Sequence, residues 1–222
     1  MKKIENQIKN QQENPDFFRV SIFGSAKIKK NDPIYKSVKN LAKELAKMEI
    51  DLVTGGGKGL MEAASLGHKQ GKKNANVRTI GVGVKLPWNQ GFNEAIEYKK
   101  EYGRFSGRLD EFMLLSNAVI VTPGGIGTLL ELFYTWQLVQ VHHICNIPII
   151  LMGEQWNGLL TWIKNNPLKT EYLTKRDFDL VFYAKNEEEV LDMIHDVHTH
   201  FKNKGKDFCL NYKRYNKFKN PK

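Results

Sequence analysis

Cysteine and long apolar segments are scarce in this chain of 222 residues. Its two cysteines, Cys145 and Cys209, provide neither a disulfide framework nor a set of metal ligands, and we expect Cys145 to be a small core residue. No apolar run approaches the ~20 residues that a membrane-spanning helix needs. Met1-Lys2-Lys3 begins like a signal peptide, but polar residues follow where an apolar segment would be required. We therefore expect a cytoplasmic protein with no membrane partner, no metal and no cofactor.

Acidic residues are the scarcer charge, since 24 Asp and Glu stand against 34 Lys and Arg, a net charge of +10. Most of this excess lies in residues 202–222, a tail with eight basic residues and one Asp that carries +7 and leaves +3 for the other 201 residues. Aromatic residues between the basic ones could contact nucleic acid. A solvated terminus is the interpretation we favour, so nucleic acid is not an expected partner.

Composition and length suit one α/β domain, because 41% hydrophobic and 26% charged residues are ordinary for a soluble globular protein. Residues 1–16 are polar, and we expect them to be an N-terminal arm, either a lead-in helix or a loose segment. Residues 17–201 contain no repeat and no internal linker, and we expect them to be the single domain. Residues 202–222 are the basic C-terminal tail described above.

Short apolar runs alternate with amphipathic segments along the chain. The pattern predicts strands at 18–23, 51–54, 77–84, 117–122, 147–151 and 180–183, and helices at 33–48, 60–71, 104–116, 126–142, 155–164 and 187–200. Residues 94–102 are ambiguous and could be a short strand. Alternation of this kind predicts a doubly wound, mostly parallel sheet with helices on both faces, which binds ligands beyond the carboxyl ends of its strands.

The most informative stretch begins with the apolar run Ala118–Val121, which reads as a buried strand. After Pro123 come three glycines in four positions, Gly124, Gly125 and Gly127, and an apolar helical segment that starts at Ile126 follows them. A strand, a glycine loop and a helix N-terminus in this order bind phosphate, because free backbone amides and the positive end of the helix dipole face the anion.

Glu131 is a charged residue between Leu130 and Leu132. At helical spacing it shares a face with Thr128 and therefore points to the mouth of the loop. The alternative is a capping box, since Thr128 and Glu131 have the spacing in which both side chains only satisfy the start of a helix. The open backbone of the glycine loop favours the ligand site.

Two further glycine turns follow strands, Gly24-Ser25 after the first and Gly55-Gly56-Gly57-Lys58-Gly59 after the second. The second turn has the spacing of neither a dinucleotide fingerprint nor a P-loop. Several such turns at one edge of a sheet nevertheless indicate a nucleotide or another phosphorylated ligand. Gly81 and Gly83 lie inside a predicted strand, which indicates that another group approaches the backbone there.

Arg104 and Arg108 are four residues apart and share one helix face. They could hold an anion against the glycine loop, or they could be solvated with Arg108 paired to Glu111; the spacing leaves both open. No Ser-His-Asp arrangement is present. Chemistry that rests on a carboxylate and a guanidinium suits cleavage of a glycosidic bond better than redox work.

These residues resemble the motifs of the LOG ("lonely guy") family over most of residues 18–165. Pro123–Glu131 is similar to the PGGxGTxxE motif of this family, and Gly55–Ala64 to its GGGPGxMEAA loop. Leu86–Asn93 resembles its LPxEQxxN turn, Phe105–Arg108 matches its FxxRK element, and Gln140 also fits.

The resemblance implies a Rossmann-like, homo-oligomeric hydrolase, a homodimer or larger. Such an enzyme cleaves the N-glycosidic bond of a nucleoside 5′-monophosphate, a cytokinin riboside monophosphate or AMP, to free base and ribose 5-phosphate. It implies catalytic roles for Glu131, on the ribose and the transition state, and for Arg108, which positions the substrate. The residues implied to bind phosphate or the rest of the nucleotide are Gly24, Ser25, Gly55, Gly56, Gly57, Glu62, Gly124, Gly125, Ile126, Gly127 and Thr128.

Two positions depart from the family pattern. Leu109 stands where the lysine after the arginine is expected, and Asn89 replaces the glutamate of the LPxEQ turn. Loss of that lysine removes a cation, which leaves a second possibility: a non-hydrolytic carrier of a nucleotide or a phosphorylated cofactor with the same fold.

Overall fold

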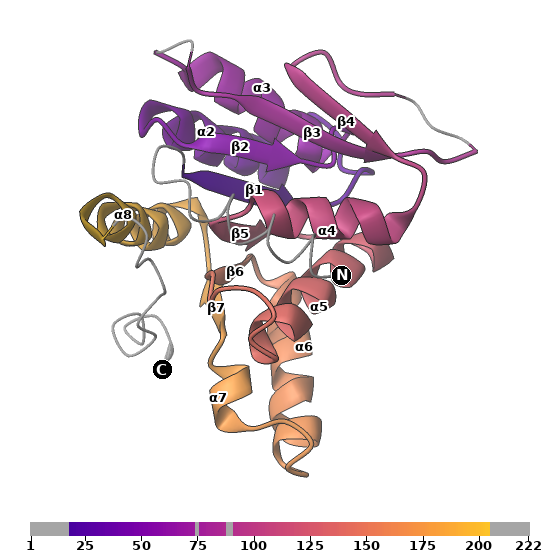
Figure 1. The fold of residues 1–222 in the computed structure, drawn as a ribbon, viewed down its shortest axis with the longest axis vertical. Coiled ribbons are helices and arrows are strands. Elements are labelled where there is room, and N and C mark those ends of the chain that lie inside the picture. The colour runs from indigo at the N-terminus through magenta and orange to yellow at the C-terminus, as the bar shows by residue number, and fades with distance from the viewer. Residues whose placement is uncertain (1–17, 74–75, 88–90, 205–222) are drawn as a thin grey trace.

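The computed structural model describes residues 18–73, 76–87 and 91–204 (Figure 1). In this part of the chain seven strands form one all-parallel sheet in the order β4-β3-β2-β1-β5-β6-β7. The strands are β1 (Arg19–Phe23), β2 (Asp51–Thr54), β3 (Thr79–Val84), β4 (Tyr98–Tyr102), β5 (Ala118–Val121), β6 (Ile149–Met152) and β7 (Val181–Ala184). The helices are α2 (Pro33–Lys47), α3 (Leu60–Gly71), α4 (Phe105–Leu115), α5 (Ile126–Gln140), α6 (Gln155–Ile163), α7 (Lys175–Phe178) and α8 (Glu187–Lys204).

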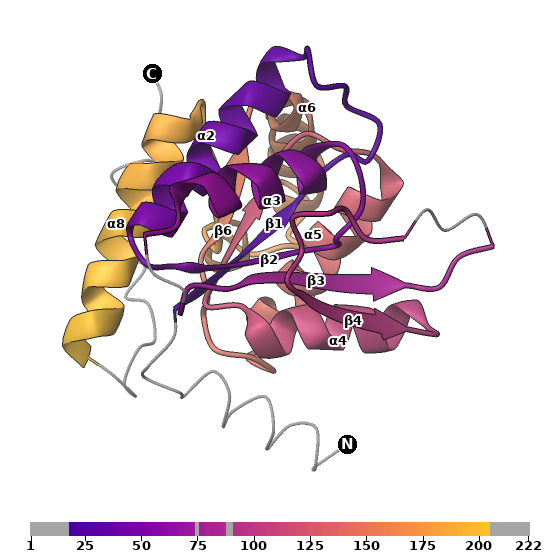
Figure 2. The ribbon, with the colours of Figure 1, turned by 90° about the horizontal axis from the view of Figure 1, so that it is seen from above.

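Helices cover both faces of the sheet, as the alternation of strands and helices predicts (Figure 2). One core packs α2, α3 and α8 against one face, and a second core packs α4, α5 and α6 against the other. The central strands are buried on both sides, which is why runs such as Ala118–Val121 are apolar at every position. The predicted doubly wound, Rossmann-like sheet is confirmed.

The order of the strands sets the place of the site. β1 lies between β2 and β5, with Phe23 paired to Val121 at the carboxyl ends of β1 and β5. From β1 the chain proceeds toward β2, β3 and β4, and from β5 it proceeds the other way. The loops after β1 and β5 therefore separate at a switch point, where doubly wound sheets bind ligands.

The ambiguous residues 94–102 end in β4, a strand at the edge of the sheet. Its sequence, Tyr-Lys-Lys-Glu-Tyr, has no apolar alternation because its residues are largely exposed. Pairing with β3 from Ile80↔Tyr98 to Val84↔Tyr102 forms this strand, and that pairing is not readable from local sequence. The sequence pattern likewise does not predict α7 or the short π-helical turn at Lys164–Leu168 after α6.

One expectation about cysteine is wrong, since Cys145 is disulfide-bonded and only partly buried. Cys209, residues 1–16 and most of the tail lie outside the described residues, so the arm and the tail stay predictions. The predicted helix at 187–200 extends as α8 to Lys204. No helix in the described ranges is long and apolar enough to cross a membrane.

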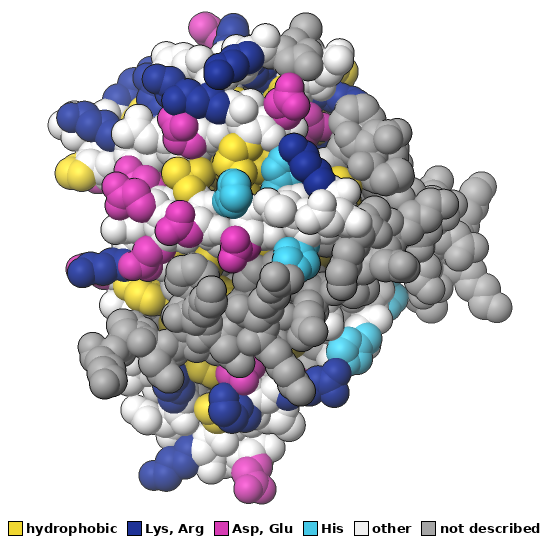
Figure 3. All heavy atoms as spheres, turned by 90° about the vertical axis from the view of Figure 1, so that its left-hand side faces the viewer, with side chains coloured by type: hydrophobic (Ala, Val, Ile, Leu, Met, Phe, Trp, Pro, Cys, Tyr) yellow, Lys and Arg dark blue, Asp and Glu magenta, His cyan; other side chains and the backbone are white. Residues whose placement is uncertain are grey.

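Basic and acidic side chains are interspersed on the face seen in Figure 3, where dark blue and magenta groups lie beside one another over the described part. Ion pairs such as Lys30–Glu62 and Lys175–Asp179 agree with this mixture. On the described part of this face, basic and acidic groups therefore alternate.

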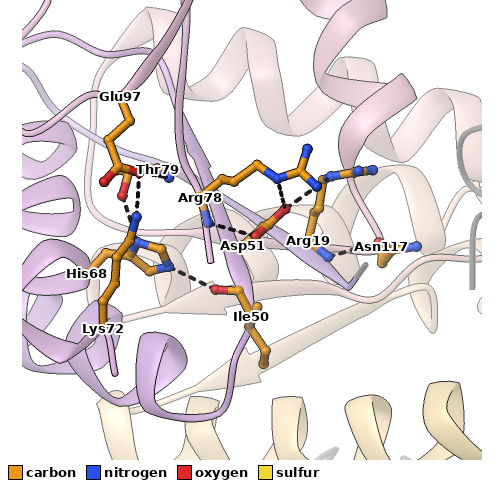
Figure 4. A network of polar contacts seen from close by, with 9 residues as sticks. All are labelled: Arg19, Ile50, Asp51, His68, Lys72, Arg78, Thr79, Glu97 and Asn117. Atoms are coloured by element: carbon orange, nitrogen blue, oxygen red, sulfur yellow. Dashed lines mark hydrogen bonds and ion pairs between the residues drawn. The ribbon is translucent and has the colours of Figure 1, made fainter. Parts of the chain in front are cut away.

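A polar network ties the amino-terminal edge of the sheet together, opposite the switch point (Figure 4). Asp51 accepts a hydrogen bond from the backbone N–H of Arg78 at 2.8 Å and lies 3.5 Å from Arg19 Nε. Burial raises the pKa of Asp51 despite these cations. His68 contacts Thr79 Oγ1 and the Ile50 carbonyl, each at 2.8 Å. These contacts join β1, β2, β3 and α3, so this edge serves stability.

Candidate functional site

An ion pair between α4 and α5 joins the two predicted catalytic residues. Arg108 Nη1 lies 2.8 Å from Glu131 Oε1, and both side chains are largely buried, at 12% and 9% exposure. Burial raises the pKa of Glu131, and the charge and hydrogen bond of Arg108 oppose this rise. The carboxylate is therefore desolvated, and its ionised form depends on one guanidinium.

Two contacts besides Glu131, and the absence of a side chain at Gly55, set the position of the Arg108 guanidinium. Its Nε donates to the Val82 carbonyl at 2.9 Å, and its Cζ lies 4.9 Å from the centre of the Phe112 ring. A Cβ at Gly55 would lie 2.5 Å from Nη2, so only glycine leaves room for the arginine there. Arg108 is thereby held across the ends of β2 and β3.

The alternative pairing of Arg108 with Glu111 is wrong. Glu111 accepts instead from Lys100 Nζ at 2.7 Å and from the Tyr102 hydroxyl. Arg104 is exposed at the start of α4, whereas the Arg108 side chain is largely buried in its ion pair. Of the two, the fold brings only Arg108 to Glu131.

The glycine loop leads into α5 without a side-chain cap. Gly125 is the N-cap of α5, which begins at Ile126, and the amide of Leu129 makes a helical bond to the Gly125 carbonyl at 3.0 Å. Thr128 lies inside the first turn and is buried, so the capping-box alternative is wrong. The first amides of a helix have no partner within it. Those of Ile126, Gly127 and Thr128 are thus free of helical bonds and suited to an anion.

The Gly24-Ser25 turn connects the other two glycine loops. The amide of Ser25 donates to the Pro123 carbonyl at 3.0 Å, and its carbonyl accepts from the Leu60 amide at 2.9 Å. Gly59 has a φ of +66°, and a Cβ there would overlap the Ser25 carbonyl. The three predicted loops therefore meet at one edge of the sheet, as expected from the parallel topology.

A cavity of about 440 Å³ opens beside Arg108. Its described lining residues are Ala26, Lys27, Gly55, Gly57, Lys58, Met61, Gly83, Val84, Leu86, Gly91, Phe92, Glu101, Phe105 and Arg108. Neither Glu131 nor the loop at 124–128 is among them. Glu62 is not among them either, and it pairs with Lys30 at 3.2 Å. The cavity thus adjoins the ion pair through Arg108 alone.

Phe92 lines this cavity and Asn93 follows it in the chain, and the sequence predicts no separate role for either residue. A Cβ at Gly81 or Gly83 would come within 2.9 Å of the Phe92 ring, which is the close approach that glycines inside β3 indicate. The Asn93 side-chain amide donates to the carbonyls of Gly56 and Gly57 at 3.0 and 2.9 Å. The turn after β3 therefore orders the glycine loop after β2.

The two departures from the LOG pattern fall in different places. Leu109 is buried at 5% exposure within the domain and is not among the described residues that line the cavity. Its apolar side chain suits that packing. Asn89 lies outside the described residues.

Fold and site together define a doubly wound α/β protein with a glycine loop and a buried Arg–Glu pair at the carboxyl edge of its sheet. A family model described as "Possible lysine decarboxylase" matches residues 61–194. The chain belongs to this family, which is the LOG family that its motifs resemble.

Curated relatives with assigned activities are similar to this chain. A "Probable cytokinin riboside 5′-monophosphate phosphoribohydrolase LOGL3" of Oryza sativa subsp. japonica is 30% identical over 161 residues, which cover 71% of this chain and 74% of the relative. A "Pyrimidine/purine nucleotide 5′-monophosphate nucleosidase" of Escherichia coli (strain K12) is 31% identical over 145 residues, 60% of this chain and 30% of that protein.

Among solved structures, the molybdenum cofactor binding protein from the phototrophic bacterium Rippkaea orientalis has a similar fold, with a TM-score of 0.59. The match has 22% sequence identity and covers 82% of this chain and 98% of that chain. At this identity the likeness concerns the fold alone. The sequence relative from rice is named as a phosphoribohydrolase, whereas the structural neighbour is named as a cofactor-binding protein. The fold alone therefore does not decide between these functions.

Proposed function

We propose that this protein hydrolyses the N-glycosidic bond of nucleoside 5′-monophosphates, among which AMP and cytokinin riboside monophosphates are the first to test. The observation that carries the proposal is the ion pair of Arg108 with Glu131, buried one turn from a glycine loop at the switch point. The names of the rice and Escherichia coli relatives support the same reaction class.

In this proposal the amides at the start of α5 bind the 5′-phosphate, which brings the ribose to Glu131 on the same helix. Cleavage of the bond between C1′ and the base nitrogen leaves positive charge on the ribose, and a carboxylate stabilises that charge. Water then adds its oxygen to C1′, and its proton goes to the departing base. Arg108 keeps Glu131 ionised and oriented.

A non-hydrolytic carrier is the second candidate. Two observations favour it: Leu109 replaces the family lysine, and Glu131 is not among the described residues that line the cavity beside Arg108. A carrier would bind a nucleotide or a phosphorylated cofactor at the same loop without turnover.

The experiment that separates them follows free base by chromatography after incubation with AMP, isopentenyladenosine monophosphate, CMP, GMP and UMP. Glu131→Gln is the control, because it keeps the size of the side chain and removes its charge. Base release above this control supports the hydrolase. Calorimetry that detects tight nucleotide binding while no base is released would support the carrier instead.

We also propose that the protein is at least a homodimer that associates through α5. Ile126, Leu130 and Phe133 are 82%, 43% and 44% exposed and are spaced four and three residues apart, so they form one apolar row on the helix. A row of three large exposed apolar side chains favours contact with a protein partner over contact with water. The row begins in the glycine loop, which would place a second copy beside the site.

A further inference from the structure

Gln155, the first residue of α6, makes two hydrogen bonds to one residue of the glycine loop. Its side-chain Nε2 donates to the Gly124 carbonyl at 2.7 Å, and its Oε1 accepts from the Gly124 amide at 3.1 Å. The primary amide thus pairs with both polar groups of a single backbone residue, as a neighbouring strand would. Nothing in the sequence singles out an exposed glutamine at the start of a helix.

Neighbouring contacts hold the same point of the loop. The Pro123 carbonyl accepts from the Ser25 amide at 3.0 Å on the side of β1. On the side of β6, Gly153 has a φ of +102°, and a Cβ there would lie 3.3 Å from the Pro123 ring. Residues 123 and 124 are therefore clamped between the ends of β1 and β6, and Gln155 supplies the polar part of this clamp.

Because of these two hydrogen bonds, the amide of Gly124 differs from the amides at the start of α5. The Gly124 amide is already bonded to Gln155 and is not available to an anion. The amides of Ile126, Gly127 and Thr128 have no helical acceptor, and they converge only while the turn before the helix keeps its shape. Preorganised donors bind an anion more tightly than donors that must first be ordered.

We propose that Gln155 is a positioning residue for phosphate binding: it holds Gly124 so that the amides at the start of α5 form one rigid anion site. The inference rests on the proposed function in that it takes the ligand of this loop to be the 5′-phosphate of a nucleotide. Gln155 itself touches neither the ribose nor the scissile bond.

The test is calorimetric binding of ribose 5-phosphate to the full chain and to Gln155→Ala. We expect the dissociation constant to rise about tenfold, because two hydrogen bonds that order the loop are lost, and this corresponds to about 1.4 kcal/mol. Asn157→Ala is the matched control, since Asn157 is exposed on the same helix and should bind like the wild type. Adenine binding should be unchanged in both variants.

Kinetics with a nucleoside monophosphate provide a second readout that a merely structural role would not give. KM should rise about tenfold in Gln155→Ala while kcat stays within about twofold, because phosphate binding is lost equally from the ground state and the transition state. Equal ribose 5-phosphate affinity in wild type and Gln155→Ala would overturn the inference. So would a wild-type protein that does not bind ribose 5-phosphate. Binding without any base release would instead count against the hydrolase alone.

Discussion

Arg108 Nη1 lies 2.8 Å from Glu131 Oε1, and Nε of the same guanidinium donates to the Val82 carbonyl. One arginine thereby couples the end of β3 to the helix that follows the glycine loop. A carboxylate buried on its own would be driven toward its neutral form. The guanidinium of Arg108 therefore favours the ionised form of Glu131, which the proposed chemistry needs, in a largely buried place.

Replacing Arg108 should affect both stability and activity. Arg108→Ala leaves Glu131 buried without a partner, and we expect a loss of about 3 kcal/mol in the free energy of unfolding, measured by urea titration. Base release should fall by at least about 100-fold. Arg108→Lys keeps the charge but cannot contact both Glu131 and the Val82 carbonyl. Its stability and activity should therefore lie between those of the wild type and Arg108→Ala. Full activity in Arg108→Ala would remove the guanidinium from the mechanism.

The pH dependence of base release should report Glu131. Because burial raises the pKa of this carboxyl, the acid limb of kcat/KM should lie above the ordinary pKa of a glutamate. Activity requires the ionised form, so it falls as the pH drops through the raised value. In Arg108→Lys the weaker pairing should move this limb to higher pH. A limb at the ordinary value in both proteins would contradict the role of Glu131.

Acid stability should depend on His68. Burial lowers its pKa from 6.5 to about 4, so between these pH values the unfolded chain binds more protons than the folded one. The contribution of His68 to the free energy of unfolding therefore falls by about 3 kcal/mol as the pH drops from about 6.5 to 4. His68→Gln should flatten this slope in urea titrations at several pH values. His198, with a pKa also lowered to about 4, continues to contribute in that variant. Equal slopes would show that His68 does not titrate as described.

Gly55 should be needed for the position of Arg108 rather than for the fold. A Cβ at residue 55 meets Arg108 Nη2 at 2.5 Å and Met61 Sδ at 2.6 Å. Both belong to flexible side chains, so Gly55→Ala should fold with the guanidinium and Met61 displaced. We expect base release to fall about tenfold or more, measured by chromatography. Gly158→Ala is the control, because nothing lies within 4 Å of a Cβ there and activity should be unchanged. Equal activity of the two variants would mean that Arg108 tolerates the shift.

The apolar row on α5 should decide the oligomeric state. Phe133→Asp introduces a charge into the row, and light scattering after size-exclusion chromatography should then give a monomer where the wild type gives a dimer or larger. Tyr172→Asp is the control, since Tyr172 is 87% exposed and lies away from α5 in sequence. An unchanged mass in Phe133→Asp would rule out this face as the interface.

Local sequence patterns predicted the regular core of the fold well. Buried strands such as Ala118–Val121 and helices with one apolar face were predicted because their periodicity depends only on near neighbours in the chain. β4 stayed ambiguous, since an exposed edge strand carries no such pattern. The disulfide of Cys145 was not predicted, because the sequence does not show whether two cysteines come close enough in the fold to form a bond.

The sequence by itself determined most strands and helices and their succession along the chain, the glycine turns, the family, and the two residues proposed for catalysis. Only the tertiary structure decided which partner each polar side chain takes: Arg108 pairs with Glu131 and not with Glu111, Glu62 pairs with Lys30, and Gln155 binds Gly124. The reason is physical. Periodicity and turn preferences are local properties of the backbone, whereas an ion pair or a side-chain clamp depends on elements that only the folded sheet brings together.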